Sequence, residues 1–136
     1  IDAHVSGHTK GGGMAAFYLA NAYYHTDQFD FALEWYKTYA DDYGDNELFT
    51  IASMMGIAAC YEGQNKYQDA AEQYTKVIGQ SAGAGQKAEG MMSLARCYKI
   101  LNQSEKAREW YAKVAKEFPE STYARDAKTA LDELGG

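Results

Sequence analysis

Proline, cysteine and long apolar runs are all scarce in this chain. Its 136 residues include one proline and two cysteines. The single proline, together with alanine throughout, favours helices over sheets. Two cysteines cannot form a disulfide framework, and neither lies in a C-x-x-C or Cys/His spacing that binds a metal. The sequence therefore predicts a helical protein that carries no metal and no other cofactor.

Neither membrane insertion of this segment nor binding to a nucleic acid is expected. The longest mostly apolar run, IASMMGIAAC at 51–60, is too short to span a bilayer. The net charge is −6, and residues 1–86 contain eleven acids and four lysines. Binding to a phosphate backbone requires a basic face, which this acidic part lacks. No signal peptide is visible, which leaves open a targeting segment removed upstream of Ile1.

One block of sequence occurs three times, at 17–36, 55–74 and 92–111, without internal gaps. The offsets between the blocks are 38 and 37 residues. A coincidence in five columns across three blocks indicates an internal repeat. The shared columns are Leu19, Ile57 and Leu94; Ala20, Ala58 and Ala95; Tyr23, Tyr61 and Tyr98; Ala32, Ala70 and Ala107; and Tyr36, Tyr74 and Tyr111.

Each block has the pattern of two helices joined by a polar turn, at 25–28, 63–66 and 101–104. Asp27 and Ser104 are candidate N-caps of the second helix. Gly63 and Asn102 suit a left-handed stop of the first helix. In the second helix an alanine precedes a tyrosine by one turn, so the small residue lets two helices approach and the ring fills the space beside it. Such hairpins bury their apolar faces by stacking.

These columns resemble the tetratricopeptide repeat, whose pattern contains L-G-x-x-Y, then an alanine, an aromatic residue and a closing proline. Ala20, Ala58 and Ala95 stand where the family has glycine, and only the third block keeps the proline, Pro119. The period is 37–38 residues instead of 34, and the resemblance covers roughly 13–119. It implies an all-α fold, a right-handed α-solenoid of three helix hairpins plus a C-terminal capping helix.

The repeat divides the chain into five segments. Residues 1–12 are a tail or the remnant of a preceding repeat, and residues 13–46, 47–83 and 84–119 are the three repeats. Residues 120–136 are the capping helix, with Ser121 or Thr122 as its N-cap. The residues expected on its buried face are Tyr123, Ala127, Ala130, Leu131 and Leu134.

The resemblance also implies a binding site. In the tetratricopeptide family, one face of each first helix lines a concave groove that binds a protein or peptide without catalysis. The corresponding residues, called the predicted groove residues below, are Met14, Phe17, Asn21, Tyr24, Met55, Glu62, Met92, Arg96 and Lys99. Phe17, Met55 and Met92 would form an apolar ladder, and Arg96 and Lys99 a basic end. We expect a peptide with apolar anchors and an acidic end.

Alternatives to this groove remain open. The same residues could pack on a flanking element, or the chain could be a structural segment of a larger array that self-associates. One family variant holds a C-terminal carboxylate with five polar residues. Only Asn21 and Arg96 fall at two of those five positions, so binding of chaperone tails is not expected.

Other residues favour no further activity. Cys60 and Cys97 share a column on helices ~8–10 Å apart, too far for a disulfide, so both are expected to be reduced and buried. His4 and His8 would pair at a metal only in a helix, which the nearby glycines disfavour. No G-x-S-x-G, P-loop or H-E-x-x-H motif occurs, so an enzyme is not expected.

The compartment is predicted only weakly. The stretch FPESTYARDAK, at 118–128, is similar to endings common in bacterial cell-envelope proteins of this repeat class. It favours a bacterial periplasm or cell envelope and leaves the cytoplasm open.

Overall fold

The computed structural model describes residues 10–44, 46–80 and 83–135. Within these ranges the chain forms seven α-helices and no strand. The chain divides between Lys66 and Tyr67 into two compact units, which we call unit 1 and unit 2. The all-α fold predicted from the sequence is confirmed.

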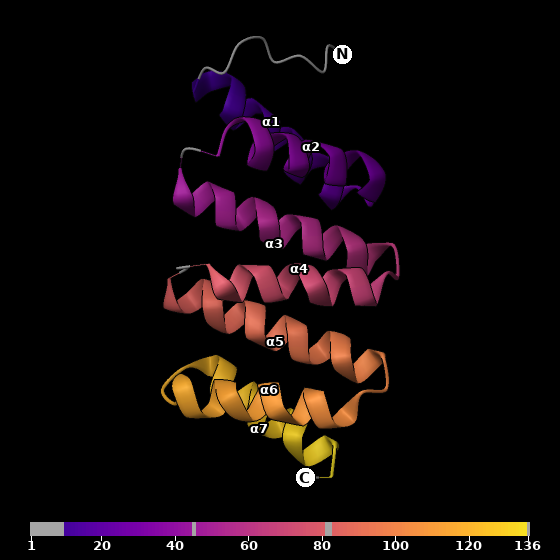
Figure 1. Cartoon of the computed structure of the whole chain (residues 1–136), viewed down its shortest axis with the longest axis vertical. Coiled ribbons are helices and arrows are strands. Elements are labelled where there is room, and N and C mark those ends of the chain that lie inside the picture. The colour runs from indigo at the N-terminus through magenta and orange to yellow at the C-terminus, as the bar shows by residue number, and fades with distance from the viewer. Residues whose placement is uncertain (1–9, 45, 81–82, 136) are drawn as a thin grey trace. The chain divides into compact units, whose positions relative to one another are not determined.

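Unit 1 contains α1 (Lys10–His25), α2 (Phe29–Asp42) and α3 (Glu47–Gly63). Helix α2 packs against both α1 and α3, and α1 touches α3 more briefly (Figure 1). The core of this unit is unusually aromatic. Its buried rings are Phe17 of α1, Trp35, Tyr36 and Tyr39 of α2, and Tyr43, which follows α2.

Unit 2 contains α4 (Tyr67–Gly79), α5 (Ala84–Ile100), α6 (Ser104–Glu117) and α7 (Thr122–Glu133). Each helix packs against the next, and α5 also touches α7. Its core is more aliphatic than that of unit 1. Met91, Tyr111, Val114 and Ala127 are buried there.

Three turns in the chain share one backbone conformation, after α1, after α3 and after α5. In each, one residue is left-handed: Asp27, Asn65 and Asn102 have φ of 60°, 61° and 61°. The next residue then donates its backbone N–H to a carbonyl five residues earlier, as in a Schellman motif. These bonds join Gln28 to Tyr23 at 2.9 Å, Lys66 to Tyr61 at 2.8 Å and Gln103 to Tyr98 at 2.8 Å. The sequence repeat is therefore also a repeat of backbone geometry.

The turns correct three expectations about helix ends. Asp27 ends α1 in the left-handed region instead of capping α2, which suits its short polar side chain. Ser104 is the first residue of α6 and not its N-cap. Gly63 is helical, and Asn65 takes the left-handed position two residues later. Asn102 has the left-handed conformation that the sequence predicts.

Close packing, not backbone freedom, explains two glycines of α3. A Cβ added to Gly56 would lie 2.5 Å from the ring of Tyr36, and one added to Gly63 would lie 2.6 Å from the ring of Phe29. Real contacts of this kind are longer, so even a methyl group would push the α2 rings away. The two glycines let aromatic rings of α2 lie directly on α3.

The two alanine columns and the tyrosine column of the second helices are buried, whereas Tyr23, Tyr61 and Tyr98 of the first helices are half-buried. The six alanines of the two columns are all 0% exposed: Ala20, Ala32, Ala58, Ala70, Ala95 and Ala107. The tyrosines of the second helices, Tyr36, Tyr74 and Tyr111, are 3–4% exposed. Small and large residues therefore alternate inside the structure as they do in the sequence.

Helix α1 begins earlier than the sequence indicates. Residues 1–12 are expected to be a tail or the remnant of a preceding repeat, and the helix starts within this segment, at Lys10. Gly12 and Gly13 are buried, and a Cβ on Gly13 would lie 3.1 Å from Tyr43. Here glycine makes room for a ring, and this packing outweighs the low helix propensity of the residue.

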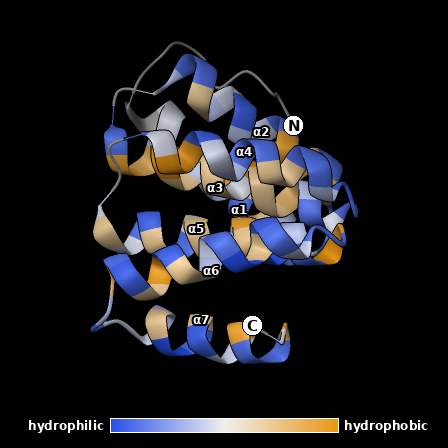
Figure 2. Cartoon of the chain, turned by 60° about the horizontal axis from the view of Figure 1, so that its bottom comes forward, coloured by the Kyte–Doolittle hydropathy of each residue, from blue (hydrophilic) through white to orange (hydrophobic). Residues whose placement is uncertain are grey.

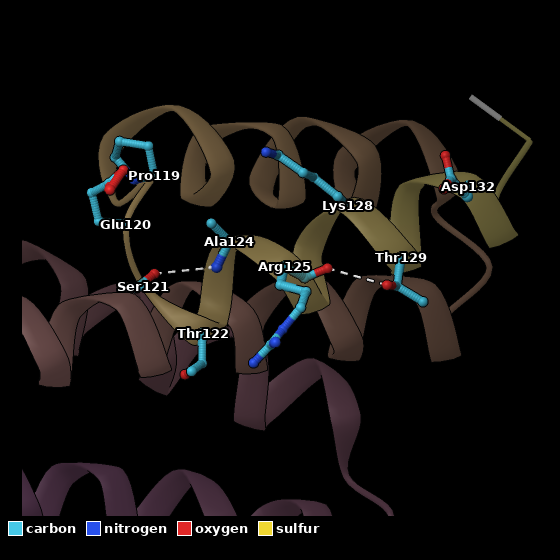
Figure 3. A pocket seen from close by; sticks show the side chains of 9 residues that line it. All are labelled: Pro119, Glu120, Ser121, Thr122, Ala124, Arg125, Lys128, Thr129 and Asp132. Carbon is cyan, nitrogen blue, oxygen red and sulfur yellow. Dashed lines mark hydrogen bonds between the residues drawn. The ribbon is translucent and has the colours of Figure 1, made fainter.

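Helix α7 matches its predicted role. The Ser121 side chain accepts a hydrogen bond from the Ala124 N–H at 3.2 Å and so caps the helix (Figure 3). All five residues expected on its buried face lie in the core of unit 2 or pack against it, and its hydrophobic side is turned toward α6 (Figure 2). At its C-terminal end, Arg108 of α6 donates to the Leu134 carbonyl oxygen at 3.1 Å.

The Gly56→Ala substitution tests the contact between α2 and α3. We expect it to lower the free energy of unfolding by about 1–3 kcal/mol, because the Tyr36 ring must move. Gly85→Ala is the matched control, since nothing lies within 4 Å of its added Cβ. Removing a helical glycine there should change stability by less than about 1 kcal/mol, toward greater stability. Urea unfolding of both variants checks this, and equal effects would contradict the packing account.

Candidate functional site

The predicted groove residues are divided between the two units. Six lie in unit 1, on α1 and α3, and three lie in unit 2, on α5. We therefore describe each group within its own unit. The unit 1 group is Met14, Phe17, Asn21, Tyr24, Met55 and Glu62, and the unit 2 group is Met92, Arg96 and Lys99.

Phe17 belongs to the core of unit 1. It is only 9% exposed, and its ring centroid lies 5.1 Å from that of Phe49 and 5.8 Å from that of Tyr39. Phe49, near the start of α3, packs against the Phe17 ring. Phe49 belongs to none of the repeated columns, so the repeat does not predict this contact. Phe17 therefore offers little exposed surface to the apolar ladder that the sequence predicts.

The other unit 1 residues are half-buried. Asn21 is held in place by Tyr36, whose hydroxyl donates to Asn21 Oδ1 at 2.5 Å. Burial raises the pKa of Tyr36, with smaller contributions from Cys60 and Tyr24, so its hydroxyl stays a donor well above neutral pH. Tyr24 meets Phe29 edge-to-face, with ring centroids 5.5 Å apart. Met14, Met55 and Glu62 complete this group.

The unit 2 residues combine an apolar side chain with two cations. Met92 is half-buried and packs against the core, whereas Arg96 and Lys99 are exposed. Lys99 Nζ lies 3.7 Å from Glu133 Oε1 of α7. Beneath them, burial raises the pKa of Tyr111, and the positive charge of Arg96 partly opposes this rise. We call Met92, Arg96 and Lys99 the basic face.

Sequence reasoning missed Glu133 as part of this site. The signal was present, because Glu133 follows Arg96 by 37 residues, the repeat period. Helix α7 thus continues the series of first helices and presents a carboxylate in the same column. Its proximity to Lys99 could be predicted only by treating the capping helix as the start of a further repeat.

Neither cysteine forms a disulfide. Cys60 and Cys97 are free and 0% exposed. Burial raises the pKa of the Cys60 thiol to about 12. The expectation that both cysteines are buried is confirmed, and their reduced state stays a prediction.

A metal site and a membrane span can be considered only for the described ranges. No group of three or more His, Cys, Asp or Glu residues there could hold a metal. His4 and His8, the pair considered from sequence, lie outside them. No described helix is long and apolar enough to cross a bilayer.

The repeat columns and the turns indicate a family of repeat proteins, and a comparison with known families identifies it. A family model described as "Tetratricopeptide repeat" matches residues 61–131, just over half of the chain. The chain belongs to the tetratricopeptide repeat family. No curated protein matches it at a significant level.

Several solved structures share the fold at low sequence identity. PcrH in complex with the chaperone binding region of PopD is 14% identical, with a TM-score of 0.78 and coverage of 97% of each chain. The N-terminal domain of STI-1 from C. elegans is 20% identical, with a TM-score of 0.76 and coverage of 96% of this chain and 100% of that one. The second tetratricopeptide repeat (TPR) domain of human RPAP3, solved with an HSP70 peptide, is 17% identical, with a TM-score of 0.72 and coverage of 91% and 95%.

The bond between Tyr36 and Asn21 predicts a measurable loss of stability. Tyr36→Phe removes the hydroxyl and leaves the ring on Gly56 in place. We expect the free energy of unfolding to fall by about 0.5–1.5 kcal/mol, since Asn21 is only half-buried and can still reach water. Tyr18→Phe, at a tyrosine that is 57% exposed, is the control and should have no effect. Equal melting temperatures for Tyr36→Phe and wild type would contradict the assigned role.

The buried thiols predict slow chemistry and alkaline sensitivity. At pH 8 a thiol reagent should label both cysteines slowly in the folded chain and quickly in denaturant. The folded pKa of Cys60 exceeds its unfolded value of about 8.5. The contribution of the neutral Cys60 thiol to the free energy of unfolding is therefore complete below about pH 8.5 and is lost as the pH rises toward 12. Rapid labelling of Cys60 without denaturant would show that α3 is packed differently.

Proposed function

We propose that this protein is a non-catalytic binding module whose basic face binds an acidic segment of a peptide or protein. One observation carries the proposal: the Glu133 carboxylate of α7 already lies 3.7 Å from Lys99. A carboxylate therefore fits beside this face. The partner's acidic group takes the place of Glu133 or lies next to it.

Glu133 is easy to displace. The Lys99 side chain is 44% exposed and that of Glu133 is 62% exposed. Exposed ion pairs of this kind contribute about 0–1 kcal/mol. A partner that places two carboxylates between Arg96 and Lys99 gains more, since the two cations lie three residues apart on one helix face.

Met92 supplies the apolar part of the site. It lies one turn before Arg96 on α5 and is half-buried against the core of unit 2. A methionine side chain adapts to ligands of different shape. The expected partner therefore has an apolar side chain about one helical turn from its acidic residues.

The distribution of charge directs an acidic partner to unit 2. Residues 1–66 contain nine acids and three lysines, whereas residues 67–136 contain ten acids and ten basic residues. The entire net charge of −6 thus belongs to the first half. Repulsion by that half and attraction by the basic face both favour binding at α5.

The similar structures support a peptide-binding role without naming a partner. Human RPAP3 was solved with the peptide SGPTIEEVD, and PcrH with a region of PopB or PopD. Short segments are thus ligands of proteins with this fold. In this chain only two of the five positions of the known carboxylate clamp, Asn21 and Arg96, carry a residue that the clamp uses. We therefore propose that the basic face binds side-chain carboxylates and not a C-terminal carboxylate.

Charge reversal tests the basic face. The probe is a labelled 12-residue peptide of glutamate and leucine, titrated at low salt and followed by fluorescence anisotropy. Arg96→Glu with Lys99→Glu should weaken binding at least about 10-fold and flatten its salt dependence. Lys76→Glu with Lys116→Glu, at exposed lysines of α4 and α6, carries the same charge change and should bind within about twofold of wild type. Equal affinity of the two double variants would overturn the proposal.

A further inference from the structure

The packing of α7 holds the Glu133 carboxylate beside the basic face. Leu134, the next residue, packs against the core of unit 2, and Arg108 of α6 donates to the Leu134 carbonyl oxygen at 3.1 Å. The Leu134 N–H in turn donates to the Ala130 carbonyl oxygen at 3.0 Å. The backbone at Glu133 is therefore fixed, and only its side chain has to be ordered when the carboxylate meets Lys99.

Glu133 lies close to both cations of the basic face. Its Oε1 atom is 3.7 Å from Lys99 Nζ. Burial raises the pKa of the Tyr111 hydroxyl, the positive charge of Arg96 opposes this rise, and the negative charge of Glu133 adds to it. Both charges act on one hydroxyl group, so Glu133 and Arg96 lie on the same side of the unit 2 core.

The end of α7 is an unfavourable place for an acid. The last turn contains Asp132 and Glu133 and no basic residue, although the partial negative charge of a helix C-terminus favours cations. Asp132 lies on the outer face of α7, which also carries Arg125 and Lys128 (Figure 3). Only Glu133 of these two acids pairs with a cation of α5. A contact outside the helix therefore stabilises a charge that α7 itself disfavours.

We propose that Glu133 is an internal competitor for the basic face, so that the free protein occupies this site with a carboxylate of its own. The inference rests on the proposed function, because it concerns the same two cations. An acidic partner exchanges one of its carboxylates for Glu133 at Lys99. Glu133 therefore lowers the affinity of the site and takes no part in holding the partner.

The exposure of the ion pair sets the size of this effect. The side chains of Lys99 and Glu133 are 44% and 62% exposed, so water screens their attraction. Removing the competitor should strengthen the binding of an acidic segment about 2- to 5-fold. A competitor of this strength lowers the affinity for acidic partners and still lets a partner with two carboxylates bind.

Neutralising Glu133 tests the proposal. The labelled glutamate–leucine peptide is titrated against the full chain at about 100 mM salt, where exposed charges more than about 10 Å apart are largely screened. Glu133→Gln should bind it about 2- to 5-fold more tightly than wild type. Asp132→Asn is the matched control, since it removes one negative charge from the neighbouring exposed residue of the same helix end. It should stay within about 1.5-fold of wild type, and equal gains in both variants would overturn the proposal.

The salt dependence of binding is a second measurement. Wild type loses the pair between Lys99 and Glu133 when it binds the peptide, so it gains one ion pair fewer than Glu133→Gln does. The affinity of Glu133→Gln should therefore fall more steeply with added salt, whereas Asp132→Asn should follow wild type. Parallel salt curves for the three chains would contradict the exchange of carboxylates.

The two proposals for this face fail in different ways. If charge reversal at Arg96 and Lys99 leaves the affinity unchanged, the basic face is not the binding site and both proposals are wrong. If charge reversal weakens binding but Glu133→Gln binds like Asp132→Asn, the basic face stands and only the internal competitor is wrong. The Glu133 side chain is 62% exposed and ends its helix, so Glu133→Gln should fold like wild type, which circular dichroism checks.

Discussion

The contact of an aromatic ring with a small residue of the next helix is the constraint on which the rest of unit 1 depends. Tyr36 lies on Gly56 and Phe29 lies on Gly63 with no room for a methyl group. These contacts fix the distance between α2 and α3. The same Tyr36 then uses its hydroxyl to hold Asn21 of α1. One side chain thus joins the packing of the unit to a residue of the predicted groove.

In unit 2 the corresponding tyrosine has a related role with different chemistry. Tyr111 occupies the column of Tyr36, and Arg96 occupies the column of Asn21. The tyrosine is buried while the cation is exposed. The repeat therefore keeps its buried residues nearly constant and varies the residue at the surface. The same helical framework therefore carries the basic face in unit 2 and the Asn21 amide in unit 1.

Much of the fold could be predicted because packing and turns repeat with a fixed period. The alanine and tyrosine columns, the capping helix and the left-handed Asn102 all follow from local pattern. Features that depend on a single tertiary contact could not be predicted. Phe17 is covered by Phe49, and Gly13 is helical beside Tyr43, although neither partner belongs to a repeated column. The basic face lies between these cases, since Arg96 and Lys99 follow from the repeat but their neighbour Glu133 comes from the capping helix.

The central claim is that the basic face on α5 is where an acidic partner binds. Its most direct test is a titration of the ¹⁵N-labelled chain with the glutamate–leucine peptide, followed by amide and side-chain chemical shifts. The account predicts that the largest changes fall on Met92, Arg96 and Lys99 and on Glu133 of α7, with α4 and the outer side of α6 unchanged. Shifts centred on α1 or on the outer face of α7, or no saturable shifts at all, would contradict it.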